Sequence, residues 1–437
     1  MKEDLEYHLG DPGNSLEEIK QKETKECLSK KCLIIINIIS VIIIIVLVIA
    51  LIVNNNSKDT DDDTEKNKNI NYKYIIFNDI NYAENNVIKN SFKIKGDNYK
   101  EDLGNINEGA DYEANELNKY DLYIPKEIIK RKTKNNRIYL YIHGGAWIEG
   151  QKFEVYQIMP YIDSNFIIAS MDYTLLLEET YKQYNIFRIV DEITATIKNI
   201  KQLLKNEGFN ENNLELVLSG VSAGGHLSML YGYLMGNKAS YIPIKYIVNY
   251  VGPLTLDPDK FLTIKSENDT LENIEPDDID EAFRKDRLVL MNGTYNNVLI
   301  DNLYLVFFMN LWLGKEKNYK INEVFIDIGR KEINKASEYY RFLLDKTKYG
   351  NPTTYVNENS IPTLCIYGGK DTMDGVAQYK ELKNSFNKFN NTKISLVYFR
   401  YGGHNVLNDN TQDGISAKKK LNEELSNFIK NYLKPLS

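Results

Sequence analysis

Ser222 stands within Gly220-Val221-Ser222-Ala223-Gly224, a G-x-S-x-G pattern at a predicted turn from strand to helix. A short apolar run, 214–218, precedes the pattern, and a helical pattern, 227–231, follows it. A sharp turn of this kind holds a serine on a strained corner with its hydroxyl facing a cleft, which suits a nucleophile that attacks a carbonyl carbon. Since a bare G-x-S-x-G occurs often by chance, its interpretation depends on the partners that a nucleophilic serine needs.

The first partner is a general base, and the chain has only 4 histidines. His404 lies downstream of the serine motif, in a glycine-containing loop that follows the predicted strand 394–399. Loops at the carboxyl ends of strands are where catalytic groups gather in an open α/β sheet. His8 precedes a long apolar segment, and His143 and His226 belong to glycine motifs in which structural roles are expected. The sequence therefore predicts His404 as the base.

The second partner is an acid that orients the base. Asp371 follows the predicted buried strand 362–367 and a glycine turn, and the order Ser, Asp, His along the chain suits such a triad. Asp374 is the alternative, although its position suits the start of the next helix, where a carboxylate caps well. Asp371 is the preferred acid.

A third motif, 143–147, reads His-Gly-Gly-Ala-Trp and follows the predicted strand 137–142. Backbone N–H groups that point at the carbonyl oxygen stabilise the charge of a tetrahedral intermediate, and glycines let the backbone come close to a substrate. We expect the N–H groups of Gly144, Gly145 and Ala223 to form this oxyanion hole. Trp147 is a candidate for lining the acyl pocket, with plain packing as the alternative.

The elements that must position these motifs alternate between strand and helix, which predicts a mostly parallel sheet. Apolar residues recur at helical spacing from Ile186 to Glu207, and Gly208 follows them. A second stripe comprises Leu421, Leu425, Phe428 and Tyr432. Both stripes are expected to pack in the core and to carry no chemistry.

Together these motifs resemble the α/β-hydrolase superfamily, and most of all its carboxylesterase and hormone-sensitive-lipase-like branch. The likeness runs from about Asn118 to the C-terminus, and it implies an α/β-hydrolase fold with the triad Ser222, Asp371 and His404. Two positions depart from the usual pattern: Val221 precedes the serine, and Thr174 stands where an arginine is common. Val221, with 225–227, looks more like small esterases, formamidases and feruloyl-type esterases.

Residues 33–53 are almost purely Ile, Leu and Val and carry no charge. A helix that spans a bilayer needs about 20 such residues, and a cleaved signal peptide usually has a shorter apolar stretch. We predict an uncleaved transmembrane anchor after a cytosolic tail, residues 1–32, and before a polar tether, residues 54–70. More lysines precede the anchor than follow it, which favours a type II single-pass protein with its hydrolase domain, residues 71–437, on the lumenal or extracellular side.

About 110 residues separate the predicted strands 246–251 and 362–367, far more than a plain crossover needs. We predict a cap insertion at about 253–350, in which the apolar run 303–313 either lines an acyl pocket or forms an ordinary buried helix. The stretch 72–109 either joins this cap or forms leading strands. The net charge of -7 gives no indication of a nucleic-acid partner, and no metal or cofactor is expected.

These features predict a membrane-anchored serine hydrolase that cleaves a small or lipid-like carboxylic ester through an acyl-enzyme. A serine amidase or peptidase of the same fold is one alternative, because the triad does not separate ester from amide substrates. A catalytically silent adhesion or binding module is another, since a fold does not fix function.

Overall fold

The computed structural model describes residues 73–90, 111–176, 186–254, 325–327, 332–333, 336, 348–371 and 377–436. The residues from Tyr74 onward belong to one compact unit. The predicted tail, anchor and tether lie outside the described residues, as do Asp374 and almost all of the predicted cap, including its apolar run. Of the helices that are described, none combines the length and the apolar character that crossing a membrane requires.

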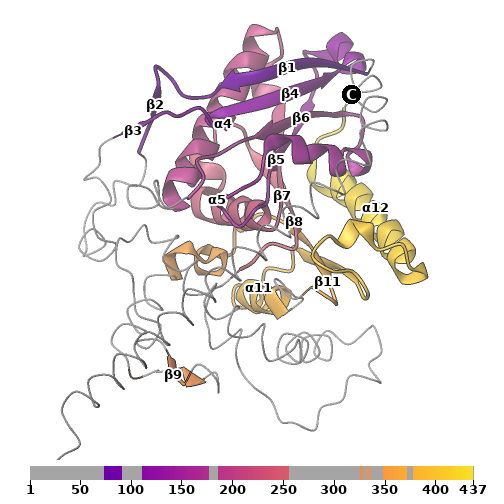
Figure 1. Ribbon diagram of the computed structural model, residues 1–437. Coiled ribbons are helices and arrows are strands. Elements are labelled where there is room, and N and C mark those ends of the chain that lie inside the picture. The colour runs from indigo at the N-terminus through magenta and orange to yellow at the C-terminus, as the bar shows by residue number, and fades with distance from the viewer. Residues whose placement is uncertain are drawn as a thin grey trace, which may run out of the picture. The chain divides into compact units, whose positions relative to one another are not determined.

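An eight-stranded sheet forms the centre of this unit (Figure 1), with the strand order β1-β4-β6-β5-β7-β8-β11-β12. From β6 to β12 all neighbours pair in parallel, whereas β1 and β4 pair antiparallel, as do β4 and β6. The strands are β1 (Tyr74–Asn81), β4 (Lys119–Pro125), β5 (Asn136–Ile142), β6 (Phe166–Met171), β7 (Leu214–Val221), β8 (Ile244–Tyr250), β11 (Thr363–Gly368) and β12 (Ile394–Phe399). The prediction of a mostly parallel sheet is confirmed, and part of the stretch 72–109 forms the leading strand β1.

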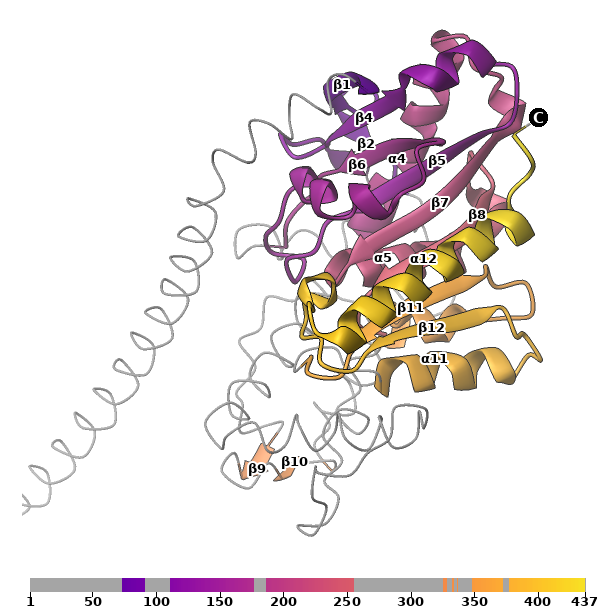
Figure 2. The same cartoon turned by 90° about the vertical axis from the view of Figure 1, so that its right-hand side faces the viewer.

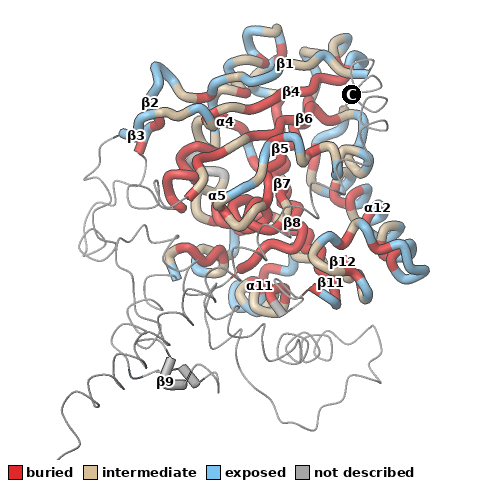
Figure 3. Tube along the Cα trace, viewed as in Figure 1, coloured by how far each residue is buried: buried red, intermediate tan, exposed pale blue. Residues whose placement is uncertain are grey.

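Helices cover both faces of the sheet (Figures 1 and 2): α4 and α5 lie on one face and α12 on the other. The α-helices are α4 (Ile186–Asn206), α5 (Ala223–Ala239), α11 (Ala377–Asn387) and α12 (Gln412–Tyr432). Because both faces are covered, β5 and β6 are buried along their whole length, and the neighbouring strands β7 and β8 are mostly buried (Figure 3).

Shorter elements complete the described residues. Two small antiparallel pairs join β2 (Val87–Ile88) to β3 (Tyr112–Glu113) and β9 (Phe325–Asp327) to β10 (Glu332–Ile333). The 3-10 helices are η1 (Lys126–Arg131), η2 (Lys152–Gln157), η3 (Met159–Tyr161), η4 (Glu211–Asn213), η5 (Lys348–Gly350), η6 (Pro352–Tyr355) and η7 (Val406–Asn408).

The two predicted apolar stripes face the core. In α4 the whole stripe is buried, and the helix is followed by Gly208, whose φ of 84° suits the left-handed turn after a helix. In α12 the side chains of Leu421, Leu425 and Phe428 are buried, and the hydroxyl of Thr411 caps the helix by accepting from the N–H of Gly414.

A buried ion pair ties α4 to the chain that leaves β6. Arg188 and Glu192 are both fully buried, and their Nε and Oε1 atoms are 2.9 Å apart. Glu192 also accepts from the backbone N–H of Thr174 at 2.8 Å, and the Arg188 guanidinium donates to the carbonyl of Glu113. The buried Arg188 guanidinium therefore lies beside Thr174, with Nε 3.2 Å from its hydroxyl oxygen. Thr174 is the residue that stands where the resembled family commonly has an arginine.

The strand order, the parallel core and the helices on both faces fit the α/β-hydrolase fold.

Candidate active site

Ser222 occupies a strained corner between β7 and α5. Its φ of 54° and ψ of -121° fall in a region that residues with a side chain rarely adopt. Backbone hydrogen bonds hold the corner: the Ser222 N–H donates to the Tyr250 carbonyl at 2.8 Å, and the His226 N–H donates to the Ser222 carbonyl at 3.0 Å. The turn predicted from the G-x-S-x-G pattern is therefore present.

Close backbone packing explains why glycine flanks this corner. A Cβ on Gly224 would lie 2.0 Å from the carbonyl oxygen of Ile142, at the end of β5. A Cβ on Gly220 would lie 2.3 Å from the carbonyl carbon of Gly224. The end of β5, which leads into the His-Gly-Gly motif, is thus pressed against the backbone of the corner.

The structure brings His404 and Asp371 together. The Nδ1 atom of His404 is 2.9 Å from Oδ2 of Asp371, whose side chain is completely buried, whereas that of His404 is 30% exposed. Asp371 follows β11 and His404 follows β12, and these two strands pair in parallel from Thr363 to Gly368. With Nδ1–H donated to the carboxylate, the imidazole has Nε2 as its basic nitrogen.

Ser222, Asp371 and His404 all follow the carboxyl ends of strands in one parallel array. The strands β7, β8, β11 and β12 are consecutive neighbours, and each pair is parallel. Parallel strands end at the same edge of a sheet, so the three candidates leave the sheet at one edge, where ligands bind in open α/β sheets.

The loop that carries the His-Gly-Gly motif lies against the serine. A Cβ on Gly144 would be 3.5 Å from the Cβ of Ser222 and 3.0 Å from the carbonyl oxygen of Val221. The next three residues all have positive φ: 92° at Gly145, 51° at Ala146 and 64° at Trp147. A run of left-handed residues persists only where surrounding contacts hold it.

His143 is one of those contacts. It is buried, its ring stacks on Tyr173 at a centroid distance of 4.1 Å, and its Nδ1 is 2.8 Å from the carbonyl oxygen of Gly144. The Tyr173 hydroxyl donates to the same carbonyl at 3.1 Å. Burial lowers the pKa of His143 to about 4, so the ring is neutral at pH 7. This geometry agrees with the structural role expected for His143.

Trp147, at the end of the loop motif, packs against His226 of α5. Their ring centroids are 5.2 Å apart in an edge-on arrangement, and the Nε2 of His226 is 2.8 Å from the carbonyl oxygen of Gly350. Burial lowers the pKa of His226 to about 3. Trp147 is only 3% exposed, which favours the packing interpretation, and its contact with an acyl group stays a prediction.

Two charged residues that the sequence reasoning passed over contact the same loop. The half-buried Glu154 accepts from the Gly144 N–H at 3.4 Å and from the Gln151 N–H at 3.2 Å. Burial raises the pKa of this carboxyl. Lys152 is almost fully buried at the first position of η2. The sequence signal for these two residues is their position directly after a glycine-rich loop. The contacts of Lys152 with Asp79 and Asp121 give no local pattern, because those residues are distant in the sequence.

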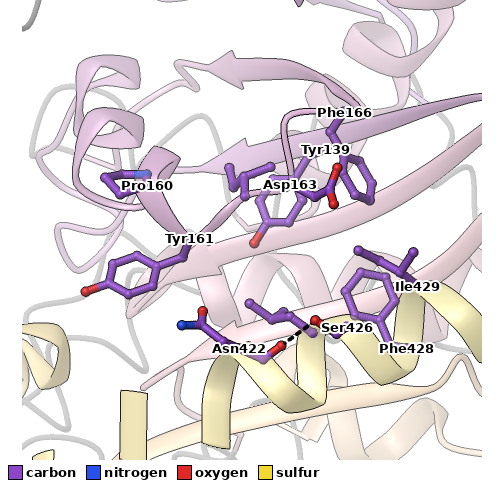
Figure 4. Close-up of a pocket in the computed structure, with 11 residues that line it drawn as sticks. Tyr139, Pro160, Tyr161, Asp163, Phe166, Asn422, Ser426, Phe428 and Ile429 are labelled. Carbon is purple, nitrogen blue, oxygen red and sulfur yellow. Dashed lines mark hydrogen bonds between the residues drawn. The ribbon is translucent and has the colours of Figure 1, made fainter. Parts of the chain in front are cut away.

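A separate cavity of about 250 Å³ lies between α12 and the start of β6. Figure 4 shows Tyr139, Tyr161 and Phe166 on one side of it and Asn422 and Phe428 of α12 on the other. None of the candidate catalytic residues lines this cavity. Within the described ranges, no cluster of three or more His, Cys, Asp or Glu side chains is arranged to hold a metal ion.

The BD-FAE family model matches residues 120–274, which include the His-Gly-Gly loop and the serine corner. No curated protein matches the chain. Among solved structures, a truncated carbohydrate esterase from gut microbiota is 14% identical, with a TM-score of 0.46, over 81% of this chain and 97% of that one. Esterase B from Lactobacillus rhamnosis is 13% identical, with a TM-score of 0.46, over 86% of this chain and 94% of that one. A Thermogutta terrifontis esterase is 14% identical, with a TM-score of 0.43, over 73% and 92%.

The BD-FAE segment spans β4 to the residues after β8, so it contains both the serine and the loop that packs against it. This match, together with a strained serine at the carboxyl edge of a mostly parallel sheet, supports an α/β-hydrolase-like domain over that segment.

Proposed function

We propose that the chain is a serine hydrolase that cleaves carboxylic esters through a covalent acyl-enzyme. The Ser222 hydroxyl attacks the ester carbonyl, and His404 Nε2 takes the serine proton and returns it to the departing alcohol. A water molecule, deprotonated by the same nitrogen, then attacks the acyl-enzyme, which releases the acid and restores Ser222. The observation that carries the proposal is the 2.9 Å contact between His404 and the buried Asp371, at the same edge of the sheet as the serine corner.

Asp371 has two effects in this scheme. Its buried carboxylate accepts the Nδ1–H of His404, which selects the tautomer with a basic Nε2. It also stabilises the imidazolium that forms when the serine proton moves. The completely buried position of Asp371 supports this role, because a buried carboxylate needs a partner that compensates for its lost hydration.

The negative charge of the tetrahedral intermediate falls to the predicted oxyanion hole, formed by the N–H groups of Gly144, Gly145 and Ala223. The proximity of Gly144 to the Ser222 side chain supports this role. Loss of one such donor typically lowers turnover by about 10²–10³-fold.

The finer features of the proposal rest on the sequence. Residues 33–53 anchor the protein in a membrane in type II orientation, and residues 54–70 tether the hydrolase domain on the lumenal or extracellular side. The substrate is a small-molecule or lipid-like ester, bound under the cap at about 253–350. Matched ester and amide substrates with the same acyl group separate this activity from that of an amidase of the same fold.

The deciding experiment is covalent labelling of the full-length, detergent-purified chain by a fluorophosphonate, which phosphonylates activated serines. We expect the unsubstituted chain to be labelled and both Ser222→Ala and His404→Ala to lose the label. Ser228→Ala, six residues along on α5, is the matched control and should keep it, since the Ser228 hydroxyl donates to the backbone carbonyl of Gly224. A folded chain that takes no label, or a Ser222→Ala variant that keeps it, overturns the proposal.

A further inference from the structure

Lys152 is a buried cation surrounded by three aspartates. Its side chain is 5% exposed, and its Nζ is 2.9 Å from Oδ1 of Asp79, 3.5 Å from Oδ2 of Asp172 and 3.7 Å from Oδ1 of Asp121. Lysine is almost never buried to this extent unless its charge is paired. We call Lys152, Asp79, Asp121 and Asp172 the lysine cluster.

The cluster joins the end of the His-Gly-Gly loop to three neighbouring strands. Asp79 lies on β1, Asp121 on β4 and Asp172 directly after β6, and these strands are adjacent in the sheet. The backbone of Lys152 is fixed as well, because its N–H donates to Oδ1 of Asp172 at 2.7 Å and its carbonyl accepts from the Ser170 hydroxyl at 2.6 Å. Lys152 is therefore held to the sheet by both its backbone and its side chain.

The loop between β5 and Lys152 needs such a fixed end. It contains the positive-φ run from Gly145 to Trp147 and a further positive φ of 105° at Gly150. Backbone in this region persists only when the surroundings over-determine it. Two residues beyond Lys152, Glu154 reaches back to the N–H of Gly144. A path of contacts thus runs from the sheet through Lys152 and η2 to the residue that lies against Ser222.

The geometry points to Lys152 as a positioning residue for the oxyanion hole: the lysine cluster fixes the loop whose N–H groups stabilise the tetrahedral intermediate. This inference rests on the proposed function, and it adds a residue that touches neither substrate nor reacting atoms. Lys152 acts through the position of Gly144 and Gly145.

Replacement of Lys152 by Met removes the charge and keeps an unbranched side chain that is one heavy atom shorter. We expect kcat for a 4-nitrophenyl ester to fall about 10²-fold, the size of effect that a displacement of about 1 Å at catalytic groups produces. KM should stay within about threefold, because oxyanion contacts are made in the transition state and hardly at all in the ground state.

The inhibition constant of a transition-state analogue distinguishes a positioning role from a merely structural one, because a structural role would leave it unchanged. A trifluoromethyl ketone forms a hemiketal with the serine and places an oxyanion in the hole. Its inhibition constant should rise in Lys152→Met by about the same factor as kcat/KM falls. The matching methyl ketone, whose carbonyl is not activated by fluorine and hardly forms a hemiketal, should bind the variant and the unsubstituted chain alike.

Two further variants keep the test decisive. Lys152→Met leaves Asp121 buried without its cation, so the double variant Lys152→Met/Asp121→Asn is measured beside it in case the single variant fails to fold. Lys198→Met is the matched control, because Lys198 pairs with Glu84 while both side chains are about half exposed or more. It should keep the kcat and the inhibition constant of the unsubstituted chain.

The outcomes separate this inference from the function on which it rests. A full-length chain that takes no fluorophosphonate overturns the proposed function, and the inference with it. A labelled chain whose folded Lys152 variants keep its kcat and its inhibition constant overturns the inference alone. The inference is also overturned if turnover falls while the trifluoromethyl ketone still binds as tightly, because the oxyanion hole would then be intact.

Discussion

The two buried histidines predict a specific loss of stability in acid. Burial lowers the folded-state pKa to about 4 for His143 and to about 3 for His226, against an ordinary value of 6.5. As the pH falls below about 6.5, the unfolded chain therefore takes up these protons before the folded chain does. The free energy of unfolding is therefore unaffected by these histidines above about pH 7, where both are neutral in either state. It decreases progressively as the pH falls toward the folded-state pKa values.

The magnitude follows from the same values. At pH 5 the unfolded form of each histidine is almost fully protonated, whereas both folded-state pKa values lie about a unit or more below the pH. Protonation of the unfolded chain therefore lowers the free energy of unfolding by about 2 kcal/mol for each histidine. The size of this decrease depends almost wholly on the unfolded-state pKa. Together they remove about 4 kcal/mol, a large part of the 5–15 kcal/mol that typically stabilises a domain.

A substitution isolates this effect from other titrating groups. Burial raises the pKa values of Asp121 and Asp172, which act in the opposite direction, so the pH dependence of the unsubstituted chain is a sum. His226→Gln removes one titrating ring and retains an N–H that can reach the Gly350 carbonyl. The drop in unfolding free energy between pH 7.5 and pH 5 should therefore be about 2 kcal/mol smaller in this variant than in the unsubstituted chain.

The assay is urea unfolding of the full-length chain in detergent, followed by circular dichroism at both pH values. His8→Gln, in the predicted N-terminal tail, is the matched control and should leave the drop unchanged. If His226→Gln shows the same drop as the unsubstituted chain, then His226 is not held neutral in the folded state, and the reasoning from its burial is wrong.

Three further substitutions test other parts of the molecule. Asp371→Asn should lower kcat for a 4-nitrophenyl ester by about 10⁴-fold, because an amide cannot select the required histidine tautomer, and steady-state kinetics measures this. Gly224→Ala should cost about 3 kcal/mol or more, since its Cβ would lie 2.0 Å from a carbonyl oxygen, whereas Gly403→Ala, with open space around it, should hardly shift the melting temperature. Arg188→Met should cost about 3–5 kcal/mol in urea unfolding by leaving the buried Glu192 unpaired, and Glu192→Gln in the same chain should recover part of that loss.

The sequence predicted the features whose causes are local. The turn at Ser222 needs small residues within a few positions, and the apolar stripe of α4 repeats at the spacing of a helix. The elements were therefore placed well: the helix predicted to end at Glu207 ends at Asn206, and the strand predicted at 394–399 is β12.

The sequence did not predict contacts between distant segments. The pairing of β1 with β4 depends on contacts between segments about 40 residues apart, and the mixed burial of β1 leaves no clear periodic signal in its sequence. The lysine cluster draws its members from four separate segments, so that no spacing along the chain reveals it. Lys152 looks like a solvated charge beside a loop, and only the fold shows that it is buried.

The contact between Gly144 and Glu154 links the oxyanion loop, which the sequence predicted, to the lysine cluster, which it did not. The predicted oxyanion donor Gly144 directs its N–H at the Glu154 carboxylate, but the distance of 3.4 Å is longer than a normal hydrogen bond of 2.7–3.2 Å. A contact of this length is weak, whereas a hydrogen bond to an oxyanion is charge-assisted and shorter. An oxyanion at normal distance therefore outcompetes Glu154 for this N–H. The contribution of Gly144 then depends on where η2 holds Glu154, and Lys152, the first residue of η2, fixes that position.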